Sequence, residues 1–211
     1  ILVVGAVAAI LKQDALLSFG ELIPGGKELL PLLGCAAVCL AAAPNTVTAP
    51  SVSLEGKNLW ILQSLPVDGK KILFAKLKLH MVITAPIAFL CGVVLNILLK
   101  PSPVTAVLTL ILPCVFIFLC GELGLLLNLK MPKLDWTNEA VTVKQSMSVM
   151  ISLFANWGII MLLAGVYYLL PVGSLISNDL FLLICIAVLA VCSAVLWKML
   201  TGWGAKRMLL L

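Results

Sequence analysis

The sequence predicts an all-α protein, a polytopic bundle of about six membrane-spanning helices with the first one truncated. Three observations carry this prediction. Of the 211 residues, 63% are hydrophobic and 11% are charged, against roughly a half and a quarter in soluble domains. The mean hydropathy is +1.20. The apolar residues fall in long blocks, most of them close to the roughly 20 residues that a membrane-crossing helix requires. A soluble globular domain and a disordered chain are therefore excluded.

Six apolar blocks follow one another along the chain. In order they span residues 1–11, which is truncated, 29–50, 79–99, 104–129, 146–170 and 180–200. The third and fourth blocks are joined only by residues 100–103, which include two prolines, so they are predicted to form a tight helical hairpin. Because the first block is too short to cross a membrane, we expect residues 1–211 to be one transmembrane domain from the carboxyl-terminal part of a longer chain.

Basic residues are distributed unevenly among the segments between the blocks. Only Lys12, Lys27 and Lys100 of the 14 lysines and arginines fall on one side of the predicted membrane. Since cytoplasmic loops carry the excess of positive charge, segments 51–78 and 130–145 and the carboxyl terminus are predicted to be cytoplasmic. The net charge of +5 then reflects topology in a lipid bilayer. Nucleic acid is not an expected partner, since binding it would need a basic soluble module.

Motifs of enzymatic chemistry are not found in the sequence. It has no H-E-x-x-H metal motif, no G-x-S-x-G nucleophile turn and no G-x-x-x-x-G-K-[ST] phosphate-binding loop. The seven cysteines all lie in apolar blocks and form no C-x-x-C pair, which disfavours disulfides and metal sites. We therefore expect no catalytic residue, no metal and no cofactor in this chain, and ATP-driven work would need a partner subunit.

One acidic residue, Glu122, lies well inside an apolar block. Ionisable groups at bilayer depth are costly, and they usually serve a purpose. Two interpretations stay open for this side chain. It is either a carboxyl group bonded to a polar neighbour or an intramembrane polar site that contacts a substrate or couples transport to an ion.

The segment 51–78 predicts a short helix between two spans. Ser53 is a candidate helix cap, the helix is expected from Leu54 to Leu65, and Pro66 ends it. Its apolar residues exceed what a solvated loop needs. Such a helix can lie on the membrane surface or dock into a groove of another protein, and the composition leaves both open.

Two motifs in this part of the chain carry a family resemblance. The first reads S-x-E-G-K-x-L-W-x-L-x-S-L-P-V over residues 53–67 and is followed by Lys76 at the start of the next helix. The second reads N-x-x-x-P-K-x-D-W-x-N-E over residues 128–139, followed by V-K-Q-S. Together they resemble the permease subunits of type-2 ATP-binding-cassette (ABC) exporters, most closely those of Firmicutes-like bacteria. The resemblance covers about residues 45–154 and includes both motifs in the expected order.

The resemblance implies a membrane-spanning permease in a bacterial plasma membrane. It would work with a second permease or permease half and with a separate ABC ATPase subunit, and an unidentified substrate would be exported. The first motif would be the cytoplasmic coupling loop that touches the ATPase, with its key positions at Glu55, Gly56, Trp60, Ser64, Leu65, Pro66 and Val67. The second cytoplasmic signature would comprise Pro132, Lys133, Asp135, Trp136, Asn138 and Glu139. Glu122 departs from the apolar residues expected in its span.

Other interpretations remain open. In the second loop, Pro132 can simply end a helix, Asp135 can cap the next one and Trp136 can anchor at the membrane interface. For the whole chain, one alternative is a secondary transporter driven by an ion gradient, which predicts ionisable groups or broken helices at mid-membrane. Another is a membrane assembly or sensor subunit that binds a partner through segment 51–78 and transports nothing.

Overall fold

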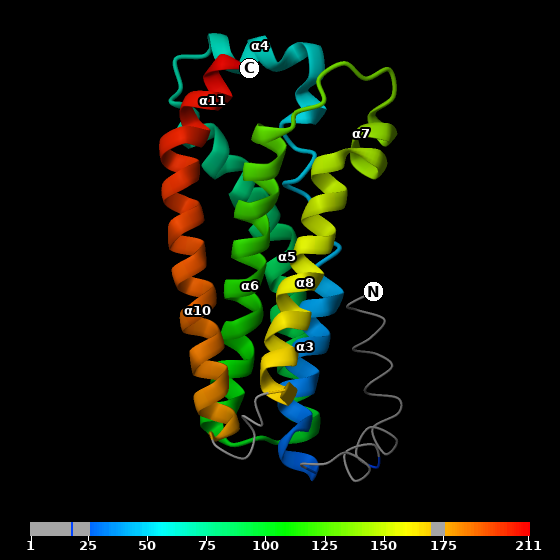
Figure 1. Ribbon diagram of the computed structural model, residues 1–211, viewed down its shortest axis with the longest axis vertical. Helices are drawn as coiled ribbons and strands as arrows, with labels where there is room; N and C mark the ends of the chain where they lie inside the picture. The colour runs from blue at the N-terminus through cyan, green and yellow to red at the C-terminus, as the bar shows by residue number, and fades with distance from the viewer. Residues whose placement is uncertain (1–17, 19–25, 170–175) are drawn as a thin grey trace. The chain divides into compact units, whose positions relative to one another are not determined.

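The computed structural model describes residue 18 and residues 26–169 and 176–211. In this part of the chain, helices connected by turns form the structure (Figure 1). Four helical runs are long and apolar enough to cross a membrane. They are α5 (Gly69–Leu99), α6 (Pro103–Lys130), α8 (Met147–Leu169) and the run of α10 (Asn178–Met199), the π-helical turn η3 (Leu200–Gly204) and α11 (Ala205–Leu210). The predicted all-α, multi-pass fold is confirmed, and the truncated block 1–11 lies outside the described residues.

The expected continuous helix over residues 29–50 is replaced by a short helix and a non-helical segment. Helix α3 (Leu30–Ala42) has 13 residues, so it is about 20 Å long, against a hydrocarbon core of about 30 Å. The helix ends before Pro44 because proline lacks an N–H donor and the residue that precedes a proline disfavours helical backbone. Residues 43–52 then run through turns.

Helices α5 and α6 form the predicted hairpin. Lys100 takes a left-handed backbone conformation with φ of 47°, and α6 begins at Pro103. Proline is favoured at the first helical position, where its missing N–H would have no partner in any case. The hydroxyl of Ser102 accepts a hydrogen bond from the backbone N–H of Thr105 at 3.2 Å. The chain therefore reverses within three residues.

Short helices occupy the two longer connecting segments. The 3-10 helix η2 (Ser53–Asn58) and α4 (Leu59–Ser64) precede α5, and α7 (Glu139–Gln145) precedes α8. Helix α5 begins ten residues before the predicted start of its apolar block. The basic stretch with Lys70 and Lys78 is therefore the first part of a helix, and the first connecting segment ends near Asp68.

The chain divides into two compact units, and we describe each by itself. The first unit contains the described part of Ile1–Ala42, with the 3-10 turn η1 (Gly26–Glu28), together with Thr84–Ile117 and Trp157–Leu189. The second unit contains Ala43–Ile83, Phe118–Asn156 and Ala190–Leu211. Helices α5, α6, α8 and α10 contribute residues to both.

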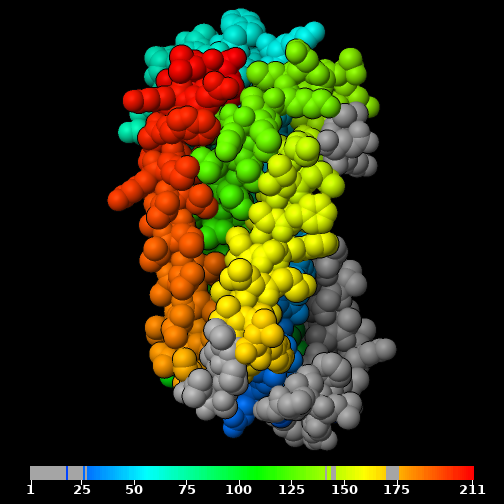
Figure 2. All heavy atoms as spheres, in the orientation of Figure 1, coloured from blue at the N-terminus to red at the C-terminus, as the bar shows by residue number. Residues whose placement is uncertain are grey.

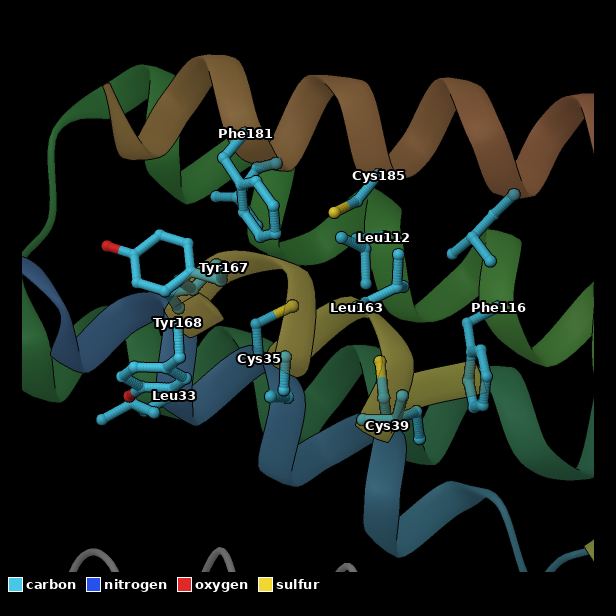
Figure 3. Close-up of a pocket in the computed structure, with 16 residues that line it drawn as sticks. Leu33, Cys35, Cys39, Leu112, Phe116, Leu163, Tyr167, Tyr168, Phe181 and Cys185 are labelled. Atoms are coloured by element: carbon cyan, nitrogen blue, oxygen red, sulfur yellow. The ribbon is translucent and has the colours of Figure 1, made fainter. Parts of the chain in front are cut away.

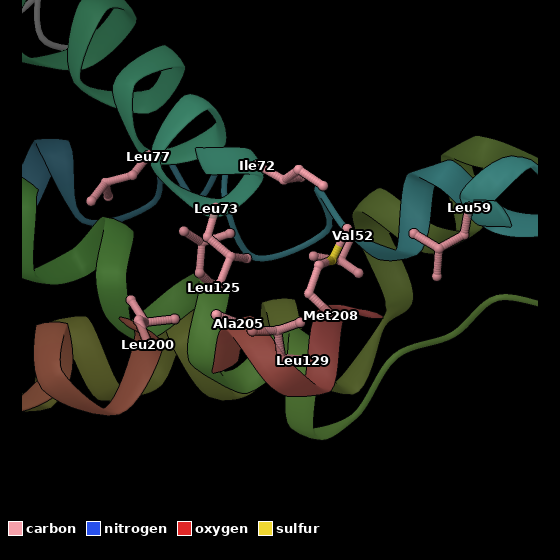
Figure 4. Close-up of a cluster of buried hydrophobic side chains, with 10 residues drawn as sticks. All are labelled: Val52, Leu59, Ile72, Leu73, Leu77, Leu125, Leu129, Leu200, Ala205 and Met208. Carbon is pink, nitrogen blue, oxygen red and sulfur yellow. The ribbon is translucent and has the colours of Figure 1, made fainter. Parts of the chain in front are cut away.

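The second unit has a compact apolar core, shown in Figure 4. Its buried members come from the first connecting segment, α5, α6, η3 and α11, and they are Val52, Leu59, Ile72, Leu73, Leu77, Leu125, Leu129, Leu200, Ala205 and Met208. Burying one large aliphatic side chain contributes about 1.5–3 kcal/mol relative to leaving it exposed. This core therefore fixes the first connecting segment and α11 to the ends of α5 and α6.

Polar side chains join neighbouring helices of the first unit. Asn96 of α5 donates a hydrogen bond to the carbonyl of Ala106 at 3.0 Å and accepts one from the hydroxyl of Thr109 at 3.0 Å. The Tyr167 hydroxyl of α8 donates to Oδ1 of Asn178 at 2.8 Å. Hydrogen bonds of this kind hold apolar helices in a defined register.

Two glycines in helix interiors give a test of this packing. A Cβ at Gly124 would lie 2.5 Å from the Thr48 hydroxyl and 3.1 Å from the backbone nitrogen of Ala49, whereas a Cβ at Gly158 would meet nothing within 4 Å. Gly124→Ala should lower the free energy of unfolding by about 1–3 kcal/mol through overpacking. Gly158→Ala should leave it unchanged or raise it by up to about 1 kcal/mol. Thermal unfolding of the purified protein measures both, and equal effects would contradict the packing of residues 43–52 on α6.

Candidate functional site

One buried amide side chain joins the two sequence motifs. Asn128, near the end of α6, accepts hydrogen bonds through Oδ1 from the backbone N–H groups of Val52 at 2.7 Å and Ser53 at 3.0 Å. Its Nδ2 donates to the hydroxyl of Ser53 at 2.7 Å and to the hydroxyl of Ser148 on α8 at 3.2 Å. An asparagine amide offers two donors and two acceptor lone pairs. Each of these is used, so Asn128 fixes the first motif to two membrane-spanning helices.

Ser53 is the second centre of this network. Its hydroxyl accepts a hydrogen bond from the backbone N–H of Lys133 at 2.9 Å, and its carbonyl accepts one from the indole N–H of Trp136 at 2.7 Å. The serine is fully buried, and η2 begins without a side-chain cap. The prediction that Ser53 caps a helix is therefore wrong, because its hydroxyl bonds to the second motif instead.

Gly56 divides the expected helix of the first motif in two. Its φ is +51° and its ψ is −129°, a conformation that a residue with a Cβ rarely adopts. A Cβ at this position would also lie 2.9 Å from the indole nitrogen of Trp136. The 3-10 helix η2 and the α-helix α4 therefore replace the single helix expected from Leu54 to Leu65, and Trp136 packs against the glycine at the break.

Glu55 forms an ion pair inside the site. Its Oε1 lies 2.6 Å from the ammonium group of Lys76 on α5, which also donates a hydrogen bond to the carbonyl of Ser51 at 2.8 Å. The two side chains are 32% and 14% exposed. Partly exposed pairs contribute at most about 1 kcal/mol. The pair therefore orients η2 on α5 more than it stabilises the fold.

The rest of the first motif lies at the surface of its unit. In Figure 2 the atoms of the α4 segment, in cyan, are exposed beside those of α11, in red. Trp60 is 64% exposed, Ile61 and Leu65 are each 47% exposed, and Val67 is 36% exposed. Ser64 and Pro66 are exposed as well. Helix α4 ends at Ser64 because Leu65, which precedes Pro66, is extended (ψ 143°). Pro66 therefore follows the helix end, as expected.

The opposite face of α4 holds it in place. Leu59 is buried in the apolar core and Leu62 packs against that core. The side-chain amide of Gln63 donates a hydrogen bond to the carbonyl of Met208 in α11 at 3.2 Å. The helix is thus fixed by one face, while Trp60 and Ile61 of α4 and Leu65 and Val67 of the segment that follows it are exposed. We name these four residues the α4 patch.

The second motif is divided between residues that hold the first motif and residues that face outward. Pro132 is half-buried and follows the end of α6, and Trp136 is half-buried against η2. Asp135, Asn138 and Glu139 are exposed, as is the side chain of Lys133. Asn138 caps α7 by accepting a hydrogen bond from the Ala140 N–H at 2.9 Å. Asp135 is therefore not the cap.

Glu122 lies in the second unit and is fully buried. Its Oε2 accepts a hydrogen bond from the hydroxyl of Ser193 on α10 at 2.6 Å. Its Oε1 has no hydrogen-bond partner among the described residues. A polar neighbour is thus present, as the first of the two interpretations requires.

Four residues of this network were not among the predicted site residues, namely Asn128, Ser148, Lys76 and Ser53. The sequence did carry a signal for Asn128, because an asparagine in the last turns of an apolar helix must find polar partners in the protein. Lys76 was expected only as the start of a helix. Which partners these residues bond depends on segments distant in the sequence, and spacing alone does not reveal that.

The fold and this site define a multi-pass helical membrane protein whose two longer connecting segments are joined by hydrogen bonds. The model of a family described as "Putative ATP-binding cassette" matches residues 27–203, which is most of the chain. The chain therefore belongs to this family and is an ABC-related membrane protein. No curated protein and no solved structure matches it.

The network gives a direct test. Asn128→Ala would leave the backbone N–H groups of Val52 and Ser53 without their acceptor, and each unpaired buried group costs about 1–3 kcal/mol. We expect a loss of roughly 2 kcal/mol or more in unfolding free energy. Faster labelling of a cysteine introduced at Asn58 should accompany this loss. The exposed Asn138 serves as the control, because Asn138→Ala should cost only a helix cap, about 1 kcal/mol. Equal losses would contradict a central role for Asn128.

Proposed function

We propose that this chain is the membrane-spanning permease subunit of an ABC exporter and that a separate ATPase subunit docks on the α4 patch. One observation carries the proposal. The α4 patch exposes a tryptophan and three aliphatic side chains on a short helix and the segment after it, and the helix is fixed from its other face. Exposed apolar surface of this kind marks interaction sites, and aromatic residues dominate the binding energy of many interfaces.

The mounting of the α4 patch supports a coupling role. Glu55 is paired with α5, and Asn128 ties the preceding residues to α6 and α8. The second motif adds the Trp136 contact. A displacement of α4 by the ATPase would therefore reach three membrane-spanning helices through hydrogen bonds and packed side chains. Rigid connections of this kind convert the closure of nucleotide-binding domains into a movement of helices.

The division of labour follows from the sequence. The chain has no phosphate-binding loop, so in this proposal ATP is bound and hydrolysed by the partner and this chain supplies the path. A second permease or permease half completes the assembly. The excess of basic residues supports a cytoplasmic position for the α4 patch and the carboxyl terminus. The family membership and the resemblance to exporters of Firmicutes-like bacteria agree with this arrangement.

The docking proposal is tested by co-purification. The ATPase encoded beside the gene would be co-expressed with the full chain, and the amount retained would be measured. Trp60→Asp and Ile61→Asp should each lower retention about tenfold or more, the factor expected for loss of a central interface residue. Val143→Asp is the matched control, because Val143 of α7 is 41% exposed and lies outside the α4 patch. Its retention should equal that of the wild type.

Two outcomes would count against docking. Unchanged retention in both α4 variants would favour the interpretation in which α4 lies on the membrane surface. If the wild type retains no ATPase, the secondary-transporter alternative gains, and Glu122→Gln becomes the first variant to assay for transport.

The Glu55–Lys76 pair gives a second prediction. Glu55→Lys should lower ATPase retention about fivefold, since two ammonium groups would face each other where an ion pair of about 1 kcal/mol orients η2. The double variant Glu55→Lys with Lys76→Glu restores the pair and should recover most of the retention. If the double variant stays as low as the single one, Glu55 touches the ATPase directly.

A further inference from the structure

The first unit contains an apolar cavity of about 80 Å³ between four helices (Figure 3). Buried residues of α6 and α10 form its floor, among them Leu112, Phe116 and Cys185. At one end the ring of Tyr167 packs against that of Phe181, with centroids 5.0 Å apart. The lining is almost entirely apolar, so the cavity offers nothing that would hold water by hydrogen bonds.

The size of the cavity restricts what can enter it. An apolar cavity of about 150 Å³ accepts a benzene ring, and this one has about half that volume. It therefore fits the end of an unbranched aliphatic chain better than it fits an aromatic ring. Each methylene group transferred from water into such a site gains about the same free energy as one buried in a protein core. An acyl chain that enters the cavity from the bilayer interior is already out of water. It therefore gains mainly dispersion contacts with the residues that line the cavity.

The mouth of the cavity lies between α3 and α8. The lining residues that are not fully buried, such as Ala36 and Ala164, all come from these two helices, whereas the lining residues of α6 and α10 are buried. Tyr168 of α8, which lines the cavity, is 59% exposed, and α8 is one of the helices that can span a membrane. Exposed apolar side chains on such a helix face acyl chains. The cavity therefore opens toward the hydrocarbon of the bilayer.

We propose that this cavity is a binding site for the end of one acyl chain of a bilayer phospholipid, inserted sideways between α3 and α8. The headgroup stays outside the cavity, because the lining presents no charged group. This inference does not rest on the proposed export function. It follows from an apolar floor, a volume suited to a linear chain and a mouth at the lipid-facing side of two helices.

The test uses the full chain in nanodiscs that contain a phosphatidylcholine with a diazirine near the terminal methyl of one acyl chain. After illumination, adducts are located by mass spectrometry. We expect adducts on the buried floor residues Leu112, Phe116 and Cys185, which lipid at the outer surface cannot reach. Ala36→Phe narrows the mouth and should lower floor labelling about fourfold or more, the factor that corresponds to one buried methylene group.

The neighbouring residue provides the control. Ala37 is exposed on α3 and does not line the cavity, so Ala37→Phe should leave floor labelling unchanged. Labelling of the exposed Val188 on α10 should stay constant in every variant and reports correct folding. Labelling confined to exposed residues would overturn the proposal, and so would equal loss in both alanine variants. Floor labelling by a diazirine palmitic acid that excess phospholipid does not suppress would also overturn it, because the occupant would then be a free fatty acid.

Discussion

The second unit depends on one interaction, the bonding of the Asn128 amide to the backbone of Val52 and Ser53. Residues 43–52 form no helix, so their backbone groups need partners from elsewhere in the protein. Asn128 accepts from the N–H of Val52, Ser148 donates to the carbonyl of Ala49, and Lys76 donates to that of Ser51. Once these residues are fixed, Ser53 can accept hydrogen bonds from the backbone N–H of Lys133 and the indole N–H of Trp136. These bonds fix the two connecting segments to each other. The joined segments in turn set the orientation of α4.

This arrangement separates residues that hold the site from residues that face outward. Glu55, Gly56 and Trp136 stand out in the sequence motifs, yet they bond or pack within the unit. Trp60 is 64% exposed, and Ile61 and Leu65 are each 47% exposed. An exposed tryptophan gains little for the stability of the chain alone, and in the proposed function it serves binding. A rigid mount also lowers the entropy cost of association, because the side chains are already ordered.

The fold could be predicted from hydropathy because helices are the main way for a single chain to satisfy its backbone in lipid. Block lengths and the two prolines near residue 102 gave the hairpin. The end of α3 before Pro44 could have been inferred from that proline. The apolar residues around Pro44, however, favoured a prediction of one continuous span. In the site, the exposed α4 segment was predicted by its excess of apolar residues. The roles of Ser53 and Asn128 were not, since their partners lie about 75 residues away in the chain. Spacing rules apply only within one helix or turn.

The non-helical segment after α3 has a consequence for how the protein is made. Asn156, the tenth residue of α8, bonds to the carbonyl of Ala43, so this carbonyl lies about halfway along a membrane-spanning helix. During synthesis, residues 43–52 leave the ribosome before α6 and α8 exist. Their peptide groups would cost several kcal/mol each in hydrocarbon without partners. We therefore expect this segment to enter the hydrocarbon only once the two later helices supply these partners, so that its insertion is completed out of its order of translation.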